Sequence, residues 1–214
     1  MIILAHRGVW KTECDKNTLK SLKKAFCCGY GIETDLRDYC GKIVISHDIA
    51  DDKSPLFDDL LQIYISSGTG LPLALNVKAD GLQKHAKELL QKYKIDNYFF
   101  FDMSIPELVV YKKMDLIYFT RQSDIEKEPI LYNSSNGIWI DGFYEEWINC
   151  KEIQRHLANG KYVSVISPEI HKKDSQGLWR MLKNIDGRKL MLCTDKPGEA
   201  EEYFNGKQNK SYLV

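Results

Sequence analysis

The chain has 214 residues, with 30 Lys and Arg balanced by 30 Asp and Glu, and its pI is near 6.9. This balance does not favour nucleic acid or an anionic membrane as a partner, so we expect a small-molecule substrate. The length suits one domain over residues 1–214. We expect a cytoplasmic protein with six reduced cysteines and no stable membrane insertion, because no secretory signal or long apolar run is evident. The oligomeric state is left open.

Apolar runs typical of strands alternate along the chain with amphipathic stretches typical of helices, which predicts a parallel sheet built from β-α units. Strands are predicted at residues 1–5, 31–36, 71–77, 98–101, 116–120, 137–140, 161–166 and 189–193. Helices are predicted at residues 18–28, 56–65, 82–93, 105–113, 146–158, 177–185 and 198–204. The segment 122–136 lacks a helical pattern.

Eight strands with intervening helices predict a compact α/β fold, the (β/α)8 TIM barrel, in which functional residues lie at the carboxyl ends of the strands. An open doubly wound sheet is the alternative. No Gly-rich phosphate loop follows the first strand, which argues against it. Polar residues follow nearly every predicted strand, namely His6, Glu33, Asn76, Lys78, Asp102, Ser104, Arg121, Asp141, Glu169, His171 and Asp195.

The most informative of these are two carboxylates, Glu33 and Asp35, on one predicted strand. Residues two apart on a strand point to the same face, so both acids face one space. Two close carboxylates repel each other unless a cation neutralises them. Oxygen ligands favour a hard divalent ion such as Mg2+ or Ca2+. The alternative for these residues alone is a solvated strand end that pairs with Arg37.

Two further motifs, His6-Arg7-Gly8 and His47-Asp48, each follow an apolar run. Histidine transfers protons near neutral pH, and the Arg7 guanidinium can bind phosphate oxygens in a fork. Two histidines, an arginine and a carboxylate pair together suggest metal-assisted phosphodiester chemistry.

The order and spacing of these motifs resemble the glycerophosphodiester phosphodiesterases, which are related to phosphatidylinositol-specific phospholipase C. The resemblance is strong over the first fifty residues, weak in the middle and local at Thr194-Asp195-Lys196-Pro197. It rests on Ala5-His6-Arg7-Gly8, Asn17-Thr18, Ala25-Phe26, Gly31-Ile32-Glu33-Thr34-Asp35, Gly41 and His47-Asp48.

The resemblance implies a barrel fold, a divalent metal ion and hydrolysis of a phosphodiester. It implies that His6 and His47 are the acid-base pair, and that Glu33 and Asp35 hold the metal. The first step in the family resembles attack by the substrate's own neighbouring hydroxyl, which gives a cyclic phosphate that water then opens.

Two positions depart from the family pattern. Lys16 stands where the family usually has Glu, and Asn76 stands where it has a third acidic metal ligand. The Asn76 carbonyl oxygen can bind a hard cation but adds no charge. Asn76 could instead form a hydrogen bond across the barrel mouth, with Glu169 or Asp102 supplying another carboxylate. Lys78 keeps the family's basic position, facing the phosphate.

The later segments resemble a divergent bacterial branch of the same superfamily. This likeness suggests that Arg121, Glu169 and His171 shape a substrate pocket. Arg121 could instead form a surface ion pair with Glu126 or Glu128, and Ser167–His171 could be a turn fixed by Pro168.

Two other functions remain open. A pseudoenzyme could bind phosphate esters after the Asn76 and Lys16 changes had abolished hydrolysis. An aldolase or isomerase could use Lys78 as a Schiff-base lysine, which requires an apolar pocket.

Overall fold

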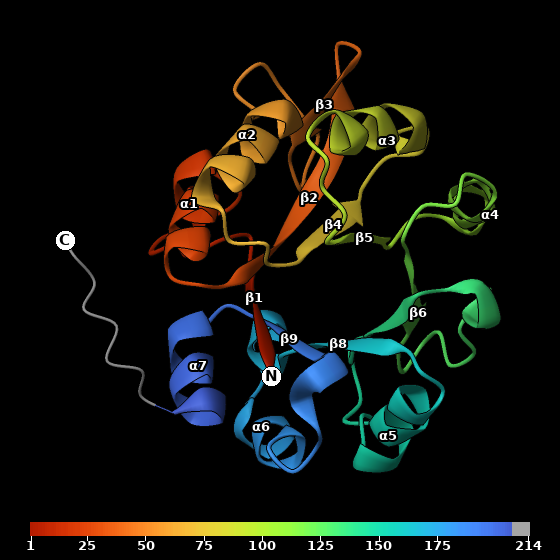
Figure 1. The fold of residues 1–214 in the computed structure, drawn as a ribbon. Coiled ribbons are helices and arrows are strands. Elements are labelled where there is room, and N and C mark those ends of the chain that lie inside the picture. Colours follow the sequence, from red (N-terminus) through yellow and green to blue (C-terminus); the bar gives the residue numbers. More distant parts are fainter. Residues whose placement is uncertain (207–214) are drawn as a thin grey trace.

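Residues 1–206 of the computed structural model are described here, and they form a ring of strands surrounded by helices (Figure 1). The parallel strands of the ring are β1 (Ile2–His6), β2 (Gly31–Tyr39), β4 (Leu73–Val77), β5 (Tyr98–Phe101), β6 (Phe119–Gln122), β7 (Gly137–Ile140), β8 (Tyr162–Ile166) and β9 (Leu190–Thr194). They are ordered β5-β4-β2-β1-β9-β8-β7-β6. An isolated bridge between Phe100 and Tyr118 brings β5 to the β6 side and closes the ring. The predicted (β/α)8 barrel is confirmed.

The helices that surround the ring are α1 (Leu19–Cys27), α2 (Phe57–Ser67), α3 (Gln83–Lys92), α4 (Ile105–Lys113), α5 (Cys150–Ala158), α6 (Gln176–Leu182) and α7 (Pro197–Asn205). As predicted, the connection from β6 to β7 contains no α-helix and only a 3-10 turn, η2 (Tyr132–Ser134). The predicted helix 146–158 is too long at its start, because the Asn149 side chain caps the first turn by accepting from the Glu152 amide.

Strand β3 (Lys42–Ile45) is an addition to the ring that the eight predicted strands did not include. It pairs antiparallel with β2, in register Leu36 with Ile45. Strand β2 is therefore longer than predicted and runs beyond the ring before β3 brings the chain back. The chain returns as far as Ser46, whose amide donates to the Asp35 carbonyl.

Apolar side chains form two separate cores. The larger one lies between strands and helices and includes Ile32 and Leu36, both fully buried. The smaller one fills the inside of the barrel. There Phe99 stacks on Phe119, and Phe101 stacks on Trp139, with ring centroids 3.8 and 3.7 Å apart respectively. The lower part of the barrel interior is thus packed with mostly apolar side chains.

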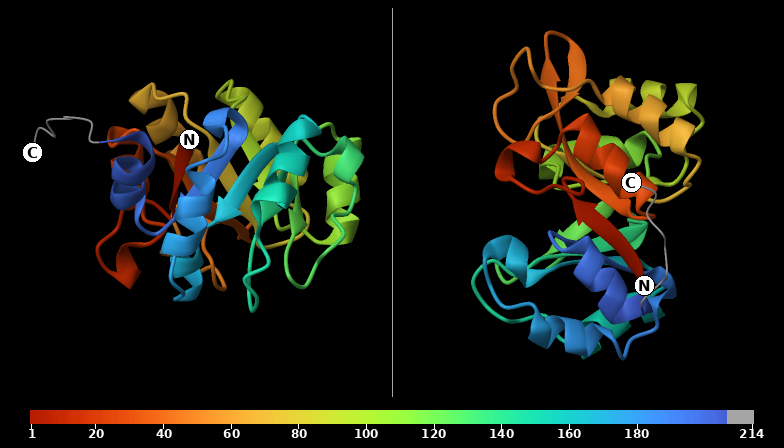
Figure 2. Two further views of the ribbon diagram at one scale, coloured as in Figure 1. Left: turned by 90° about the horizontal axis from the view of Figure 1, so that it is seen from below. Right: turned by 90° about the vertical axis from the view of Figure 1, so that its left-hand side faces the viewer.

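The loops that follow the strands lie together at one end of the barrel, along the lower edge of the left view in Figure 2. Because all eight ring strands are parallel, this end carries every strand's carboxyl terminus. Within residues 1–206 no helix is long and apolar enough to cross a bilayer. The six cysteines all fall within this range and form no disulfide.

Candidate active site

Strand register places four of the predicted site residues side by side at the barrel mouth. His6, at the end of β1, is aligned with Glu33 on β2. Asp35, two residues further along β2, is aligned with Asn76 on β4. The predicted convergence of the Glu33 and Asp35 side chains follows from this register, while Ile32 packs on the opposite face in the outer core.

The carboxylate pair is almost completely shielded from water. Glu33 is 2% exposed and Asp35 is fully buried. Burial, and then repulsion from Asp35, raise the pKa of Glu33 to about 7. Three buried oxygen atoms, one each from Glu33 (Oε2), Asp35 (Oδ1) and Asn76 (Oδ1), make no hydrogen bond. The three residues that the sequence suggested as metal ligands therefore each present an unsatisfied oxygen.

Two cationic side chains contact Asp35. Arg7 Nε lies 3.0 Å from Asp35 Oδ2, and Lys78 Nζ lies 3.5 Å from Asp35 Oδ1. Arg7 adopts a left-handed backbone conformation, with φ of 55°. Its amide donates to the Glu33 carbonyl, and its carbonyl accepts from the Asn17 amide. This uncommon conformation for a non-glycine residue directs the guanidinium toward β2.

Arg37 does not neutralise the carboxylate pair, so that alternative is wrong. Its Nε and Nη2 atoms donate instead to the His47 carbonyl, at 3.2 and 3.1 Å. This contact ties the chain after β3 to β2.

His6 is held on one side by Asp195, which directly follows β9. The distance between His6 Nδ1 and Asp195 Oδ1 is 2.6 Å. The other ring nitrogen, Nε2, faces Glu33 Oε2 at 3.8 Å. The indole of Trp10 donates from Nε1 to the His6 carbonyl at 3.0 Å.

His47 lies apart from this cluster. Its side chain is 45% exposed, and Nδ1 is 2.9 Å from Asp48 Oδ1. No contact between His47 and His6 occurs among the described residues. The structure therefore brings His6 together with the carboxylates and leaves His47 on the loop after β3.

The neighbouring strand ends add further charge. Asn76 Nδ2 donates to Asp102 Oδ2 at 3.1 Å, which is the cross-mouth hydrogen bond considered above. Burial raises the pKa of Asp102. Arg121 lies 3.0 Å from Glu126 through Nε and 3.8 Å from Asp102 through Nη1. Arg121 thus forms the ion pair with Glu126 that was its alternative role, although it also reaches the mouth.

The carboxylate of Glu169 accepts hydrogen bonds from neighbouring strand ends, unlike the unsatisfied oxygens of Glu33, Asp35 and Asn76. It accepts hydrogen bonds from the Ser167 and Thr194 hydroxyls and from the Asp195 amide, the last at 3.2 Å. All its partners belong to the ends of β8 and β9. Glu169 therefore joins these strand ends and is not free to bind a metal at the carboxylate pair.

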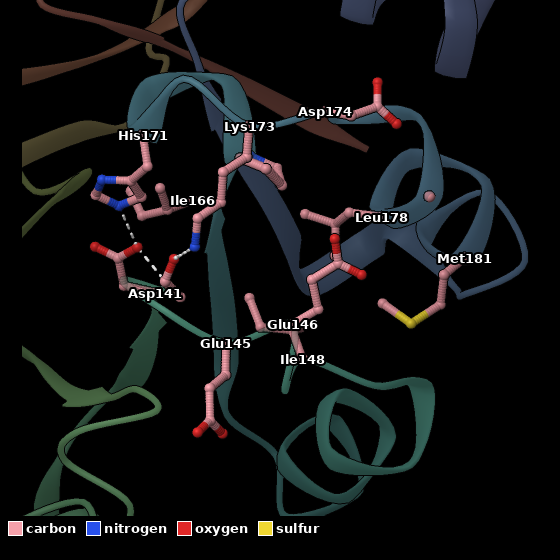
Figure 3. A pocket seen from close by; sticks show the side chains of 13 residues that line it. Asp141, Glu145, Glu146, Ile148, Ile166, His171, Lys173, Asp174, Leu178 and Met181 are labelled. Carbon is pink, nitrogen blue, oxygen red and sulfur yellow. Dashed lines mark hydrogen bonds and ion pairs between the residues drawn. The ribbon is translucent and has the colours of Figure 1, made fainter.

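His171 lines a neighbouring cavity of about 110 Å3 beside α6. Its Nε2 lies 2.7 Å from Asp141 Oδ1, and this hydrogen bond raises the pKa of His171. Figure 3 shows the pair at one edge, with Leu178 and Met181 across the cavity. The role of His171 in substrate binding stays a prediction.

Three mouth residues were given no role in the predicted site: Lys16, Asn17 and Asp195. Asp195 was recognised as a polar residue after a predicted strand, and its place beside His6 follows from the pairing of β1 with β9, in which Ala5 is aligned with Thr194. The sequence indicated Asn17 only as part of the Asn17-Thr18 motif and did not indicate its contacts. Its contacts come from a loop whose path the sequence pattern does not predict.

The donor set at β2 and β4 fits a hard divalent cation. Within residues 1–206 no group of three or more His, Cys, Asp or Glu side chains is arranged to hold a metal ion. The unsatisfied oxygens of Glu33, Asp35 and Asn76, however, combine two carboxylates with an amide carbonyl. These are the ligand types that Mg2+ and Ca2+ take.

Comparison with known proteins agrees with this architecture. No protein-family model and no curated protein sequence matches the chain. Among solved structures, a candidate glycerophosphodiester phosphodiesterase from Galdieria sulphuraria superposes with a TM-score of 0.78 at 18% identity, over 95% of this chain and 97% of that one. An Oleispira antarctica phosphodiesterase, solved with its product sn-glycerol-3-phosphate, gives 0.71 at 17% identity, over 96% and 97%.

A glycerophosphodiester phosphodiesterase from Agrobacterium tumefaciens gives a TM-score of 0.67 at 17% identity, over 96% of this chain and 99% of that one. At these identities the likeness concerns the fold. The chain has the (β/α)8 barrel fold of glycerophosphodiester phosphodiesterase structures, the family that its sequence motifs resemble.

Proposed function

We propose that the protein hydrolyses a small phosphodiester, such as a glycerophosphodiester or a lipid- or polysaccharide-derived fragment, with a bound divalent cation. The observation that carries this proposal is the placement of His6 beside two buried carboxylates, each with one buried oxygen that accepts no hydrogen bond. The structural likeness to phosphodiesterases supports it, and one of those proteins was solved with sn-glycerol-3-phosphate.

Glu33, Asp35 and Asn76 would hold the cation through their unsatisfied oxygens. A bound Mg2+ or Ca2+ would offset the negative charge that develops on the phosphoryl group. The third ligand, Asn76, is neutral, and the ammonium of Lys78 lies beside Asp35 and offsets part of its negative charge. We therefore expect a site that is less negative, and binds the cation more weakly, than one with three carboxylates.

The two histidines would move protons. His6 Nε2 would accept the proton of the attacking hydroxyl, because Nδ1 is already bonded to Asp195. His47, on the exposed loop after β3, would protonate the departing alcohol after the loop approaches the mouth. Arg7 and Lys78 would orient the phosphate oxygens.

The attacking hydroxyl would belong to the substrate. A hydroxyl next to the phosphodiester is already positioned, and it makes attack intramolecular. The product of this step is a cyclic phosphate, which water then opens. A substrate that lacks this hydroxyl should fail.

A pseudoenzyme that binds phosphate esters is the alternative function. In this alternative, the cationic side chains at the barrel mouth would bind the phosphate group but no hydrolysis would follow. The aldolase alternative is less consistent with the structure, because Lys78 lies beside a carboxylate and not in an apolar pocket.

Phosphorus NMR of a glycerophosphodiester incubated with the protein and Mg2+ or Ca2+ tests the proposal. We expect a monoester product and a transient cyclic phosphate, both absent with the Glu33→Gln/Asp35→Asn variant. Efficient hydrolysis of a deoxy analogue would contradict the cyclic route only. Calorimetric binding of sn-glycerol-3-phosphate without turnover of any diester would favour the pseudoenzyme.

A further inference from the structure

The cavity beside α6 lies between that helix and the loops that follow β7 and β8 (Figure 3). Its volume is about 110 Å3. A water-sized group needs about 10–15 Å3, so the cavity has room for a chain of several carbon atoms. The apolar side chains that line it are those of Ile148, Ile166, Pro168, Leu178 and Met181. The chemistry proposed for the carboxylate pair leaves this cavity without a role.

The cavity shares the mouth of the barrel with the proposed reaction centre. Ile166 ends β8 and packs in the core inside the barrel, whereas Leu178 and Met181 lie on α6 outside the ring. The cavity therefore extends outward from the barrel interior. Its polar edge is formed by Asp141, which directly follows β7. Burial and then the charge of Asp141 raise the pKa of Asp102, so this edge also belongs to the mouth.

One wall of the cavity, formed by the segment 141–148, is held from two sides. The amides of residues 143–145 donate to the Asp124 carboxylate at 2.6 to 3.0 Å. The carbonyls of residues 142–143 accept from Lys173 Nζ at 3.2 and 2.8 Å. The wall is therefore formed before any ligand enters, which avoids the entropic cost of ordering a loop on binding.

The charges around the cavity disfavour an anionic ligand. The Glu146 carboxylate points toward Leu178 across the cavity in Figure 3. The two cationic groups of the lining already have partners, since Lys173 bonds the loop carbonyls and His171 bonds Asp141. A second negative charge beside Glu146 would be repelled. An uncharged apolar chain would instead gain free energy by leaving water for the apolar lining.

We propose that this cavity binds an uncharged apolar chain on the alcohol that leaves during phosphodiester hydrolysis. The inference rests on the proposed function for the reaction. The attacking and leaving oxygens are roughly in line at phosphorus, so the leaving alcohol points away from His6, the proposed base. Strand β9 separates β1 from β8 in the ring. A chain in the cavity therefore leaves the space beside Arg7 and Lys78 to the phosphate.

Methyl NMR tests binding without any turnover. Butan-1-ol or hexan-1-ol is added to protein that carries 13C-labelled methionine methyl groups. The Met181 resonance is identified by its loss in Met181→Leu. We expect this resonance to shift saturably with hexan-1-ol, and to reach the same shift only at a higher concentration of butan-1-ol, because the shorter chain buries less apolar surface.

Gly177→Leu obstructs the cavity with little risk to the fold. Gly177 lines the cavity, is the second residue of α6, and has no atom within 4 Å of the position of an added Cβ. Gly198→Leu is the matched control, because Gly198 is the second residue of α7, has the same open space and does not line the cavity. The Met181 shift should disappear in Gly177→Leu and persist in Gly198→Leu. Leu178→Trp is a second obstructing variant.

Kinetics test whether the ligand is the leaving alcohol. For glycerophosphodiesters of ethanol, propan-1-ol and butan-1-ol, kcat/KM of the wild type should rise about fourfold for each added CH2. A carboxylate at the end of the chain should remove this gain. Gly177→Leu should hydrolyse the three esters at nearly equal rates, with the ethyl ester unaffected. Gly198→Leu should keep the dependence on chain length.

The outcomes separate this proposal from the proposed function. A Met181 resonance that neither alcohol shifts would overturn the binding site. A Met181 shift together with equal kcat/KM values for the three esters would overturn the assignment to the leaving alcohol. Faster hydrolysis of an ammonium-ended chain than of a methyl-ended chain would indicate pairing with Glu146 and overturn the apolar ligand. A Met181 shift in a protein that hydrolyses no diester would refute the proposed function and leave a cavity that binds alcohols.

Discussion

Asn17 and Asp35, which belong to different strand-to-helix segments, are joined by a 2.8 Å hydrogen bond from Asn17 Nδ2 to Asp35 Oδ2. The Asn17 carbonyl oxygen accepts from the Thr34 hydroxyl, also at 2.8 Å. One side-chain amide thus contacts two consecutive residues of β2. Its donor side faces the carboxylate, so the amide fixes the orientation of Asp35 without adding charge.

Asn17→Asp should therefore be more harmful than Asn17→Ala. The aspartate would place a third carboxylate against the pair and leave Asp35 without its amide donor. Alanine would leave the buried Thr34 hydroxyl unpaired and remove one of the donors to Asp35, at a cost of about 1–3 kcal/mol. Urea unfolding at neutral pH measures both effects. Equal stability of the aspartate variant and the wild type would contradict this account.

Replacing both acids in Glu33→Gln/Asp35→Asn should abolish binding of Mg2+ and Ca2+. The single variant Glu33→Gln should be more stable than the wild type in a chelator above pH 7. The sign follows from the raised pKa of Glu33. A carboxyl group whose folded pKa is raised loses its stabilising contribution as pH rises from about 4.5 through about 7.

Titration calorimetry with each metal is the measurement for the double variant, and urea unfolding at pH 6 and 8 is the measurement for Glu33→Gln. Unchanged affinity for divalent ions would remove these residues as ligands. A preference for Zn2+ over the hard ions would contradict the assignment of oxygen ligands.

His6→Ala and His47→Ala should each lose nearly as much activity as the double variant. Two groups that serve one transition state give losses that do not add, and each loss should be roughly a hundred- to ten-thousandfold. Rates on a chromogenic phosphodiester test this. Fully additive losses would indicate that one histidine acts independently, and the exposed His47 is the one whose contribution the geometry leaves least constrained.

Gly8→Ala should destabilise the loop that carries His6 and Arg7. Gly8 has φ of 91°, and a Cβ there would lie 2.6 Å from the Ser21 backbone carbon. Both the left-handed conformation and the backbone contact disfavour alanine, so we expect a loss of at least about 2 kcal/mol. Gly41→Ala is a useful comparison, because it is also left-handed but has open space around its Cβ position. An equal loss in the two variants would show that the Ser21 contact contributes nothing.

His156 should make stability fall as pH falls, independently of the active site. It is fully buried on α5 and bonded to Tyr132 and Gln122, both at 2.8 Å. Burial lowers the pKa of His156 from 6.5 to about 4. The unfolded chain therefore binds a proton before the folded protein does, and the contribution is complete above pH 6.5 and lost as pH falls toward 4.

The size of this effect should be about 2–3 kcal/mol between pH 7 and 4, from the difference in pKa. Urea unfolding of the wild type and of His156→Gln at several pH values isolates it, since the other titrating groups are common to both proteins. Parallel pH curves for the two proteins would exclude the contribution.

The sequence predicted the ring of strands well, because a parallel strand covered on both faces is a continuous apolar run bounded by polar residues. Val77 and Phe101 end their strands as expected. Strand β3 coincides with the apolar run that precedes His47-Asp48, but that run alone does not show that the strand lies outside the ring. Its direction decides where His47 lies, so that placement could not be predicted.

The candidate site was predictable where it depends on alternation along a strand and not where it depends on loops. Glu33 and Asp35 share a face because of strand geometry alone. The partners of Glu169 and Arg121 depend on how loops fold over the mouth, and both side chains are engaged by neighbours there. The position of Asp195 at the end of a strand was predictable, but its contact with His6 depends on the pairing of the first strand with the last.

The closure between β5 and the residues before β6 is unlike the other seams of the ring. One bridge, Phe100 with Tyr118, and a 3.0 Å hydrogen bond from the Phe100 amide to the Ile117 carbonyl mark the backbone pairing there. The side chains of Phe99 and Phe119 also stack on each other between these strands. β1 lies in the middle of the strand order, so thermal breathing at this seam would leave its hydrogen-bonded neighbours in place. The side of the mouth that carries Asp102 and Arg121 is therefore held by few backbone hydrogen bonds, whereas β1, which carries His6, is paired with a strand on each side.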